Sequence, residues 1–124
     1  MVPRRKIAPA PVMVIEDDHD VRVSLRSILE DEGFEVITAT NGRDAISVLR
    51  SHTLLPGLIL LDLRMPIMDG WAFASVLKSD PVLAAVPVVV ITADTRSPPV
   101  NVIEVLQKPL KYGRLLQLAE LYCC

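Results

Sequence analysis

The feature that most constrains the fold is a regular alternation of short apolar runs with segments of helical periodicity. Runs of strand length, bounded by turn residues, occupy residues 12–15, 34–38, 58–62, 86–92 and 101–107. Apolar residues recur at helical spacing in residues 20–32, after Asn41-Gly42 (Ala45, Ile46 and Leu49), in residues 69–79 and in residues 112–122. The alternation predicts an α/β domain of three layers, in which helices cover both faces of a parallel sheet.

The length and composition are those of one globular domain. The chain has 124 residues, of which 51% are hydrophobic and 23% are charged. This is enough apolar material for a core and unlike the composition of a disordered segment. We expect an N-terminal tail at residues 1–11, with a short basic stretch, and a single domain at residues 12–124.

Charge, hydropathy and cysteine usage exclude several classes of protein. The net charge is −2 and the lysines and arginines are interspersed, which argues against nucleic acid or an anionic membrane as a direct partner. The apolar run at residues 82–91 is interrupted by Pro87 and is too short to span a bilayer. Cys123 and Cys124 are adjacent, which fits neither a disulfide framework nor a metal site, so we expect a cytoplasmic location.

The connection between the last two predicted strands is anomalous. Only residues 93–101 separate Thr92 from Val102, and Pro98-Pro99 lies within them. A parallel crossover normally takes a dozen or more residues, including its helix. The sequence therefore predicts that the fourth helix is reduced to a turn or missing.

Acidic residues follow two of the predicted strands. Glu16, Asp17 and Asp18 come after the first strand, and Asp62 ends the third. If these strands are neighbours, Asp17 and Asp62 converge at the carboxyl edge of the sheet, where open α/β folds bind ligands. Two carboxylates about 5 Å apart repel by roughly 3 kcal/mol at an effective dielectric constant of about 20. The cluster then requires a proton or a cation.

The absence of nearby His or Cys ligands favours a hard ion, Mg²⁺ or Mn²⁺. A simpler interpretation of the acidic triplet is helix capping, with a favourable contact to the helix dipole. Capping does not explain Asp62, which ends a separate buried strand.

Two further polar residues end the fourth and fifth predicted strands. Thr92 could be structural, and Lys108 could be a surface residue whose ammonium group reaches solvent. Together with the two acids, however, they supply what a phosphoryl group requires: a metal site, an acceptor, a hydrogen-bond donor and a counter-charge.

The sequence closely resembles the receiver domain of two-component response regulators. The matching motifs are "VIEDD" at 14–18, "LLDLRMPIMDG" at 60–70, "VVVITA" at 88–93 and "QKP" at 107–109. The resemblance runs from about residue 12 to residue 122. It implies a flavodoxin-like, doubly wound parallel sheet of five strands in the order 2-1-3-4-5.

The resemblance also implies roles for the acidic residues. Asp62 matches the phosphoacceptor, which takes a phosphoryl group from a histidine kinase or a histidine phosphotransfer protein. Asp17 matches a direct Mg²⁺ ligand, Glu16 an acid that acts through water, and the carbonyl of Arg64 a third protein ligand. Asp18 is expected to cap the first helix.

Further positions match residues that contact the phosphoryl group. Thr92 matches the hydroxyl that moves onto it, Ala93 a small residue whose N–H reaches it, and Lys108 its pairing cation. The Lys108-Pro109 peptide is a candidate for the cis form. The resemblance also implies that Arg64 and Asp94 flank the path of attacking water, and if they pair across the site they would prolong the phosphorylated state.

The chain departs from the family where the fourth helix should be, and Val105 replaces an aromatic residue of the fifth strand. We therefore expect phosphotransfer to survive and signalling to an unknown output domain or effector to be altered. An alternative is a non-phosphorylated pseudo-receiver that acts as a protein interaction module. A haloacid-dehalogenase-type phosphohydrolase is a further alternative, but it would need an Asp at position 64, where this chain has Arg. In the main interpretation the protein is not an enzyme, although it assists its own phosphotransfer and dephosphorylation.

Overall fold

The computed structural model describes residues 9–51 and 54–124. Its strands are β1 (Val12–Ile15), β2 (Val36–Ala39), β3 (Leu58–Asp62), β4 (Val88–Thr92) and β5 (Glu104–Gln107). Its α-helices are α1 (His19–Asp31), α2 (Gly42–Ser51), α3 (Gly70–Ser79) and α4 (Tyr112–Cys123), and a 3₁₀ turn covers Leu83–Ala85. Most of the predicted N-terminal tail, residues 1–8, lies outside the described residues.

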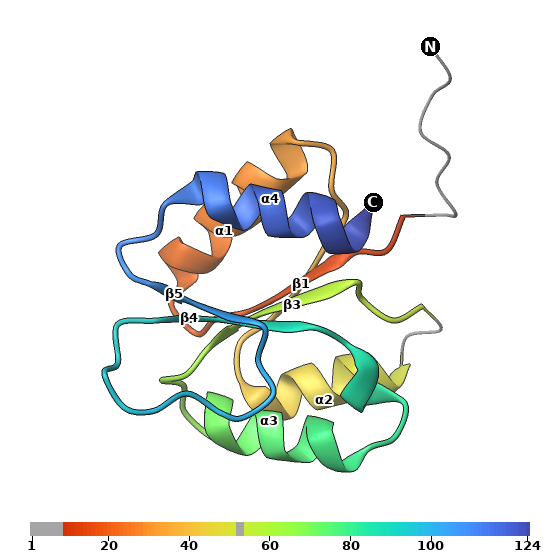
Figure 1. The fold of residues 1–124 in the computed structure, drawn as a ribbon, viewed down its shortest axis with the longest axis vertical. Coiled ribbons are helices and arrows are strands. Elements are labelled where there is room, and N and C mark those ends of the chain that lie inside the picture. The colour runs from red at the N-terminus through yellow and green to blue at the C-terminus, as the bar shows by residue number, and fades with distance from the viewer. Residues whose placement is uncertain (1–8, 52–53) are drawn as a thin grey trace.

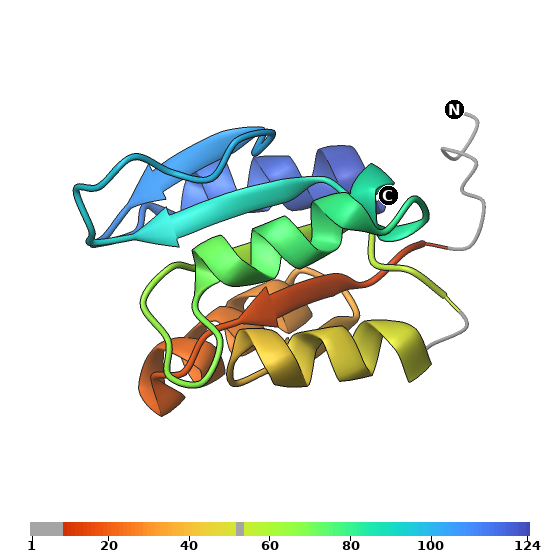
Figure 2. The same ribbon diagram turned by 90° about the horizontal axis from the view of Figure 1, so that it is seen from below.

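The strands form one parallel sheet in the order β2-β1-β3-β4-β5, as predicted. Helices α1 and α4 cover one face of the sheet, and α2 and α3 cover the other (Figures 1 and 2). The prediction of a three-layer, flavodoxin-like α/β domain is confirmed. No helix in the described ranges is long and apolar enough to cross a membrane.

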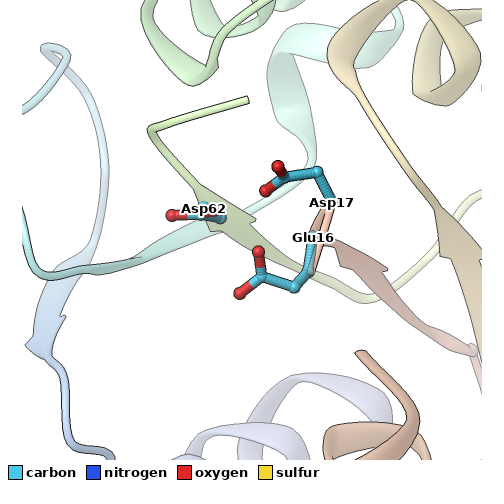
Figure 3. A group of neighbouring side chains, drawn as sticks. All are labelled: Glu16, Asp17 and Asp62. Atoms are coloured by element: carbon cyan, nitrogen blue, oxygen red, sulfur yellow. The ribbon is translucent and has the colours of Figure 1, made fainter. Parts of the chain in front are cut away.

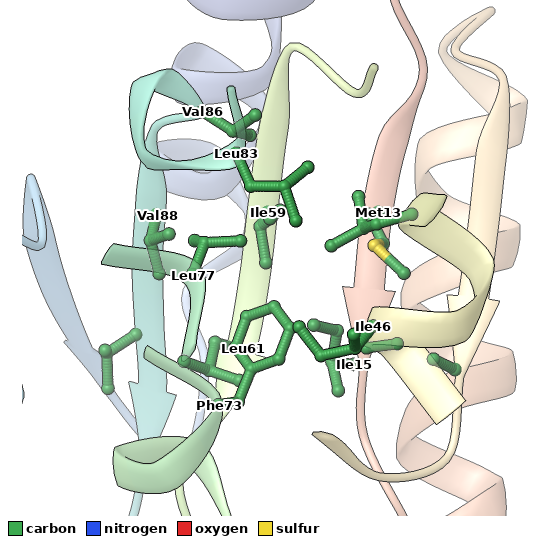
Figure 4. Packing of buried hydrophobic residues seen from close by; sticks show 14 of the residues in the cluster. Met13, Ile15, Ile46, Ile59, Leu61, Phe73, Leu77, Leu83, Val86 and Val88 are labelled. Atoms are coloured by element: carbon green, nitrogen blue, oxygen red, sulfur yellow. The ribbon is translucent and has the colours of Figure 1, made fainter. Parts of the chain in front are cut away.

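The core consists of two apolar clusters, one on each face of the sheet. Successive residues of the central strands enter opposite clusters, since Met13, Ile59 and Leu61 pack under α2 and α3 (Figure 4), whereas Val12 and Leu60 pack under α1 and α4. Every residue of β1, β3 and β4 is buried. Burial on both faces explains why these strands are continuous apolar runs and not alternating ones.

Three strands begin later than predicted, each for a local reason. Phe34 follows the turn that ends α1: Gly33 has φ +90°, and the N–H of Phe34 donates to the carbonyl of Leu29 at 3.1 Å. The N–H of Val86 closes the 3₁₀ turn by bonding to the Leu83 carbonyl at 3.0 Å, and Pro87 has no N–H to pair. Asn101, at φ 67°, turns the chain before β5.

The segment between β4 and β5 contains no helix. Residues 93–103, all of which the structure describes, form neither helix nor strand and consist of bends, one turn and irregular chain. The prediction that the fourth helix is reduced or missing is confirmed. Helix α4 of this chain is therefore the last helix of the fold, and it covers the same face of the sheet as α1 (Figure 1).

The loop between β3 and α3 is fixed closely against the rest of the fold. The N–H of Gly42 donates to the Met68 carbonyl and the N–H of Gly70 to the Leu63 carbonyl, both at 2.9 Å. A Cβ atom on Gly70 would lie 2.7 Å from the Cα of Leu63 and 2.8 Å from the Asp62 carbonyl oxygen. Glycine at position 70 therefore lets helix α3 start directly against the end of strand β3.

The same loop contains a strained residue. Ile67 has φ 70°, and the N–H of Met68 donates to the Pro66 carbonyl at 2.7 Å, so the three residues form a γ-turn centred on Ile67. A β-branched residue is rarely found in this left-handed region. The Ile67 side chain is 76% exposed, so packing does not offset the strain.

We predict that Ile67→Gly stabilises the protein. Relief of the strain, which costs about 1–3 kcal/mol, should exceed the added entropy of glycine in the unfolded chain, for a net gain of about 1 kcal/mol. Urea unfolding measures the difference. Ile67→Ala is the matched control, because it keeps the Cβ atom and should gain less; an equal gain in both variants would contradict the prediction.

Candidate functional site

Three carboxylates meet at the carboxyl edge of the sheet. Glu16 and Asp17 follow β1, and Asp62 ends the neighbouring strand β3, whose Leu61 is in register with Ile15 (Figure 3). One carboxylate oxygen from each of Glu16, Asp17 and Asp62 lies within 4.8 Å of the other two. Glu16 and Asp62 are buried, whereas Asp17 is exposed. The convergence of Asp17 and Asp62 that the sequence predicts is present.

Lys108, which follows β5, brings a positive charge to this cluster. Its Nζ atom lies 2.8 Å from Oε1 of Glu16 and 3.7 Å from Oδ1 of Asp62. Its backbone N–H donates to the carbonyl of Thr92 at 2.8 Å, which holds it at the end of the sheet. The Lys108-Pro109 peptide bond is cis, as the sequence predicts. The lysine is thus closer to Glu16 than to Asp62.

The pKa values of the two buried acids move in opposite directions. Burial, together with a hydrogen bond and repulsion from Glu16, raises the pKa of Asp62 from 3.8 to about 7. Burial also acts to raise the pKa of Glu16, but hydrogen bonds from Asp62 and Lys108 outweigh it and lower the value. The pair therefore holds a proton near neutral pH when no other cation compensates its charge.

The donor set of this cluster fits a hard divalent cation. Glu16, Asp17 and Asp62 offer only carboxylate oxygens, and the exposure of Asp17 leaves room for water on one side. The side chain of Asp18 points elsewhere, because it caps α1 by accepting the N–H of Val21 at 3.0 Å. Mg²⁺ or Mn²⁺ would neutralise the excess negative charge that otherwise favours protonation of Asp62.

Thr92 is buried at the end of β4, next to the acidic cluster. Its Oγ1 atom accepts a hydrogen bond from the backbone N–H of Asp94 at 2.8 Å. Within the described ranges, the hydroxyl has no hydrogen bond to Asp62. Ala93, the next residue, is exposed. The hydroxyl oxygen of Thr92 is thus bonded to the backbone of the loop that follows β4.

Asp94 is held by two arginines. Its Oδ2 atom lies 3.0 Å from a guanidinium nitrogen of Arg64 and 3.0 Å from one of Arg96, and its side chain is 4% exposed. Hydrogen bonds from Arg96 and Arg64 hold the pKa of this carboxyl well below its usual range. The pairing of Arg64 with Asp94 across the site, a condition of the predicted water block, is present.

A hollow of about 270 Å³ opens beside the acidic cluster. Its lining residues are Asp17, Leu63, Arg64, Met65, Pro66, Asp69, Trp71 and Arg96. Asp69, besides lining it, caps α3 by accepting the N–H of Ala72 at 2.9 Å. The hollow reaches the acidic cluster at Asp17, its exposed member.

Sequence reasoning missed two arginines of the site. Arg22 donates to the carbonyl oxygens of Glu16 and Asp17, at 3.0 Å and 3.2 Å, and so fixes the loop that carries both acids. Arg96 bonds to Asp94 and stacks on Trp71. Neither has a motif of its own. The only available signal was the helical turn between Asp18 and Arg22 and the short separation of Arg96 from Asp94.

Residues 12–120 match the family described as the response regulator receiver domain. The chain belongs to this family. The match covers both acidic motifs, Thr92 and Lys108, so the receiver residues that the sequence suggested fall inside the matched region. The chain is thus a two-component signalling module of the phosphoacceptor kind, and not an enzyme that turns over a separate substrate.

Two relatives illustrate the range of receiver-containing proteins. An uncharacterized 14.6 kDa protein in the sodA1 3′ region of Leptolyngbya boryana is 32% identical over 94% of this chain and 92% of its own length. The response regulator Rre1 of a Synechocystis strain is 37% identical over 68% of this chain but only 36% of its own length. The chain therefore spans about a third of the second relative.

The fold also matches solved receiver structures. The crystal structure of a response regulator receiver protein from Pseudomonas putida superposes with a TM-score of 0.83 at 26% sequence identity, covering 93% of this chain and 98% of that one. Likeness over nearly the whole of both chains shows that the receiver architecture is kept although residues 93–103 form no helix.

We predict that Asp62→Asn stabilises the metal-free protein at alkaline pH. The folded-state pKa of Asp62, about 7, exceeds its ordinary value of 3.8, so protonation of Asp62 stabilises the folded protein. This stabilisation is complete at pH values below 3.8 and is lost as the pH rises through 7. The asparagine side chain does not titrate, so the variant should gain on the order of 2 kcal/mol at pH 8, and the gain should shrink between pH 7 and pH 4.

Urea unfolding in the presence of a chelator, repeated across this pH range, measures the effect. Asp31→Asn, which changes an exposed acid at the end of α1, is the control and should show no such change between pH 6 and pH 8. A gain for Asp62→Asn that does not depend on pH would contradict the assigned cause.

Proposed function

We propose that the protein is a phosphorylation-dependent signalling module of a two-component phosphorelay, and that Asp62 is its phosphoacceptor. The observation that carries the proposal is the position of the Asp62 carboxylate, buried at the end of a central strand but bordered by two acids and Lys108. A carboxylate in this setting can act as a nucleophile once its charge is balanced.

In the proposed reaction an Asp62 carboxylate oxygen attacks the phosphorus of a phosphohistidine on the partner. A P–O bond forms while the N–P bond breaks, and the departing imidazole keeps the electron pair and takes up a proton. The product is an aspartyl phosphate, which water later hydrolyses to inorganic phosphate and the free carboxylate. Most of the catalysis consists of positioning and charge stabilisation, as in other phosphoryl transfers.

The residues around Asp62 would stabilise the transferred group. Lys108 is 3.7 Å from Asp62 and can move its ammonium group from Glu16 to a phosphoryl oxygen. Thr92 would donate its hydroxyl, and Ala93 its backbone N–H, to the other oxygens. Each of these contacts would stabilise negative charge that develops on the phosphoryl oxygens.

Asp17 and Asp62 would hold Mg²⁺ or Mn²⁺ directly, Glu16 would act through water, and Arg64 would add its backbone carbonyl. When bound, the ion supplies charge neutralisation at the phosphoryl oxygens. The three carboxylates and the raised pKa of Asp62 support this assignment, because among the described residues only Lys108 forms ion pairs with the carboxylates of the cluster.

Receiver domains interact with histidine kinases. For this chain we propose a histidine kinase or a histidine phosphotransfer protein as the phosphodonor. We further propose that residues 12–124 form the receiver domain, that it acts in the cytoplasm, and that its target is an output domain or effector. The Rre1 relative is longer than this chain, which is compatible with a receiver joined to further domains.

We predict that a small acyl phosphate with Mg²⁺ adds one phosphoryl group to the wild-type protein and none to Asp62→Asn. Intact-mass spectrometry, followed by peptide mapping, measures both the amount and the site. Asp69→Asn is the matched control, since Asp69 lines the same hollow but ends no strand, and it should still be labelled. Labelling of Asp62→Asn would refute the assignment, whereas no labelling of any form would favour the pseudo-receiver alternative.

We predict that Arg64→Ala shortens the lifetime of the phosphorylated protein. Arg64 and Asp94 form an ion pair at 3.0 Å, and in this proposal the pair limits the approach of water to Asp62. Loss of a barrier contribution of about 1 kcal/mol would raise the hydrolysis rate about fivefold. Release of phosphate after removal of the donor measures the rate, and Arg43→Ala, on exposed α2 surface, should leave it unchanged. An unchanged rate in Arg64→Ala would exclude the water block.

A further inference from the structure

The connection that replaces the fourth helix is anchored to α3 by an aromatic contact. We refer to Asp94, Thr95, Arg96 and Ser97 as the 94–97 turn. The guanidinium carbon of Arg96 lies 4.0 Å from the centre of the Trp71 ring, and the Nε1 atom of Trp71 donates to the Ser97 carbonyl at 2.9 Å. Trp71 lies in the first turn of α3. The turn is therefore fixed to α3 at both its side chain and its backbone.

The turn is also closed by its own acidic residue. The Asp94 carboxylate accepts hydrogen bonds from the backbone N–H of Arg96 at 2.8 Å and from its guanidinium group at 3.0 Å. The same carboxylate pairs with Arg64 at 3.0 Å. Because one nearly buried carboxylate organises these contacts, a displacement of Asp94 has to change the position of Arg96 as well.

Thr92 connects this network to the acidic cluster. The hydroxyl oxygen of Thr92 accepts the backbone N–H of Asp94 at 2.8 Å, and this is the hydroxyl that would turn towards a phosphoryl group on Asp62. After that rotation the Asp94 N–H loses its acceptor. A buried or half-buried N–H without a partner is unfavourable, so the turn has to move to find another one.

We propose that the 94–97 turn transmits the phosphorylation state of Asp62 to Trp71, so that the surface that signals phosphorylation is formed by this turn and the first turn of α3. The inference rests on the proposed phosphoacceptor function. It assigns to Asp94, Arg96 and Trp71 the transmission that residues 93–103 cannot perform as a helix. Val105, which has no polar atom in its side chain, cannot act as a second hydrogen-bonded relay on β5.

The strength of the coupling between Asp62 and Trp71 depends on the difference in free energy between two arrangements of the turn. In the arrangement described here, the Thr92 hydroxyl, the Asp94 carboxylate and the Arg96–Trp71 stack are all satisfied. A cation–π contact at an exposed site biases such an equilibrium by about two- to fivefold. Phosphorylation has only to exceed this bias to release the stack.

The test uses the fluorescence of Trp71, which is the single tryptophan of the chain. Acrylamide quenching is measured on the metal-free protein, with Mg²⁺, and with Mg²⁺ plus acetyl phosphate, while intact mass gives the phosphorylated fraction. We expect phosphorylation to raise the quenching constant about twofold beyond the value with Mg²⁺ alone, because the guanidinium group no longer covers the ring.

Two pairs of variants test whether the response of Trp71 depends on the Thr92 hydroxyl and on the Arg96 guanidinium group. Thr92→Ser keeps the hydroxyl and should keep the response per phosphorylated molecule, whereas Thr92→Val should lose it. Arg96→Gln should show high quenching before phosphorylation and little further change, and Arg96→Lys should fall between Gln and wild type. Arg43→Gln, on exposed α2 surface, is the control and should behave as wild type.

The outcomes separate this inference from the proposed function. If Asp62 takes no phosphoryl group, the phosphoacceptor proposal fails and this inference fails with it. If Asp62 is phosphorylated but the quenching of Trp71 does not change, only the transmission through the turn is overturned. The same holds if Thr92→Val and Arg96→Gln show the full wild-type change in quenching. Should Thr92→Val not become phosphorylated, loss of the response in phosphorylated Arg96→Gln supports the inference and a wild-type response refutes it.

Discussion

The repulsion between the buried carboxylates of Glu16 and Asp62 is the constraint on which the site depends. Two adjacent parallel strands end at the same edge, so acids that follow β1 and end β3 are brought together by the fold itself. Lys108 offsets part of the charge and raises the preference of Glu16 for its ionised form. The remaining excess falls on Asp62, which makes it a strong acceptor for any positive or electrophilic group.

The second organising group is the Asp94 carboxylate. Its polar contacts order the segment between β4 and β5, where a crossover helix would normally lie. A crossover helix would normally cover the edge of the sheet near β5 and bury apolar side chains. Here residues 93–103 obtain their order from the bonds of Asp94 to Arg64 and Arg96 and from the stack on Trp71. Such contacts are individually weak at a surface, but several of them act together on the same short turn.

Most of the fold followed from the sequence because periodicity and strand composition agreed in every segment. The strand order 2-1-3-4-5 was implied by family resemblance, and the convergence of Asp17 with Asp62 depended on it. Strand starts were misplaced at Phe34, Val86 and Asn101, where turn hydrogen bonds compete with strand pairing. Arg22 and Arg96 were missed because a guanidinium group that bonds to carbonyls or to a neighbouring acid leaves no spacing rule in the sequence.

The absence of a helix between β4 and β5 has a consequence for the rate of the response. Displacing a helix is a collective motion that takes microseconds to milliseconds, whereas surface turns rearrange in nanoseconds to microseconds. A chain whose residues 93–103 form no helix would therefore relax soon after each phosphoryl transfer or hydrolysis. Its output would follow the chemistry at Asp62 with almost no delay, and the lifetime of the aspartyl phosphate alone would set the duration of the signal.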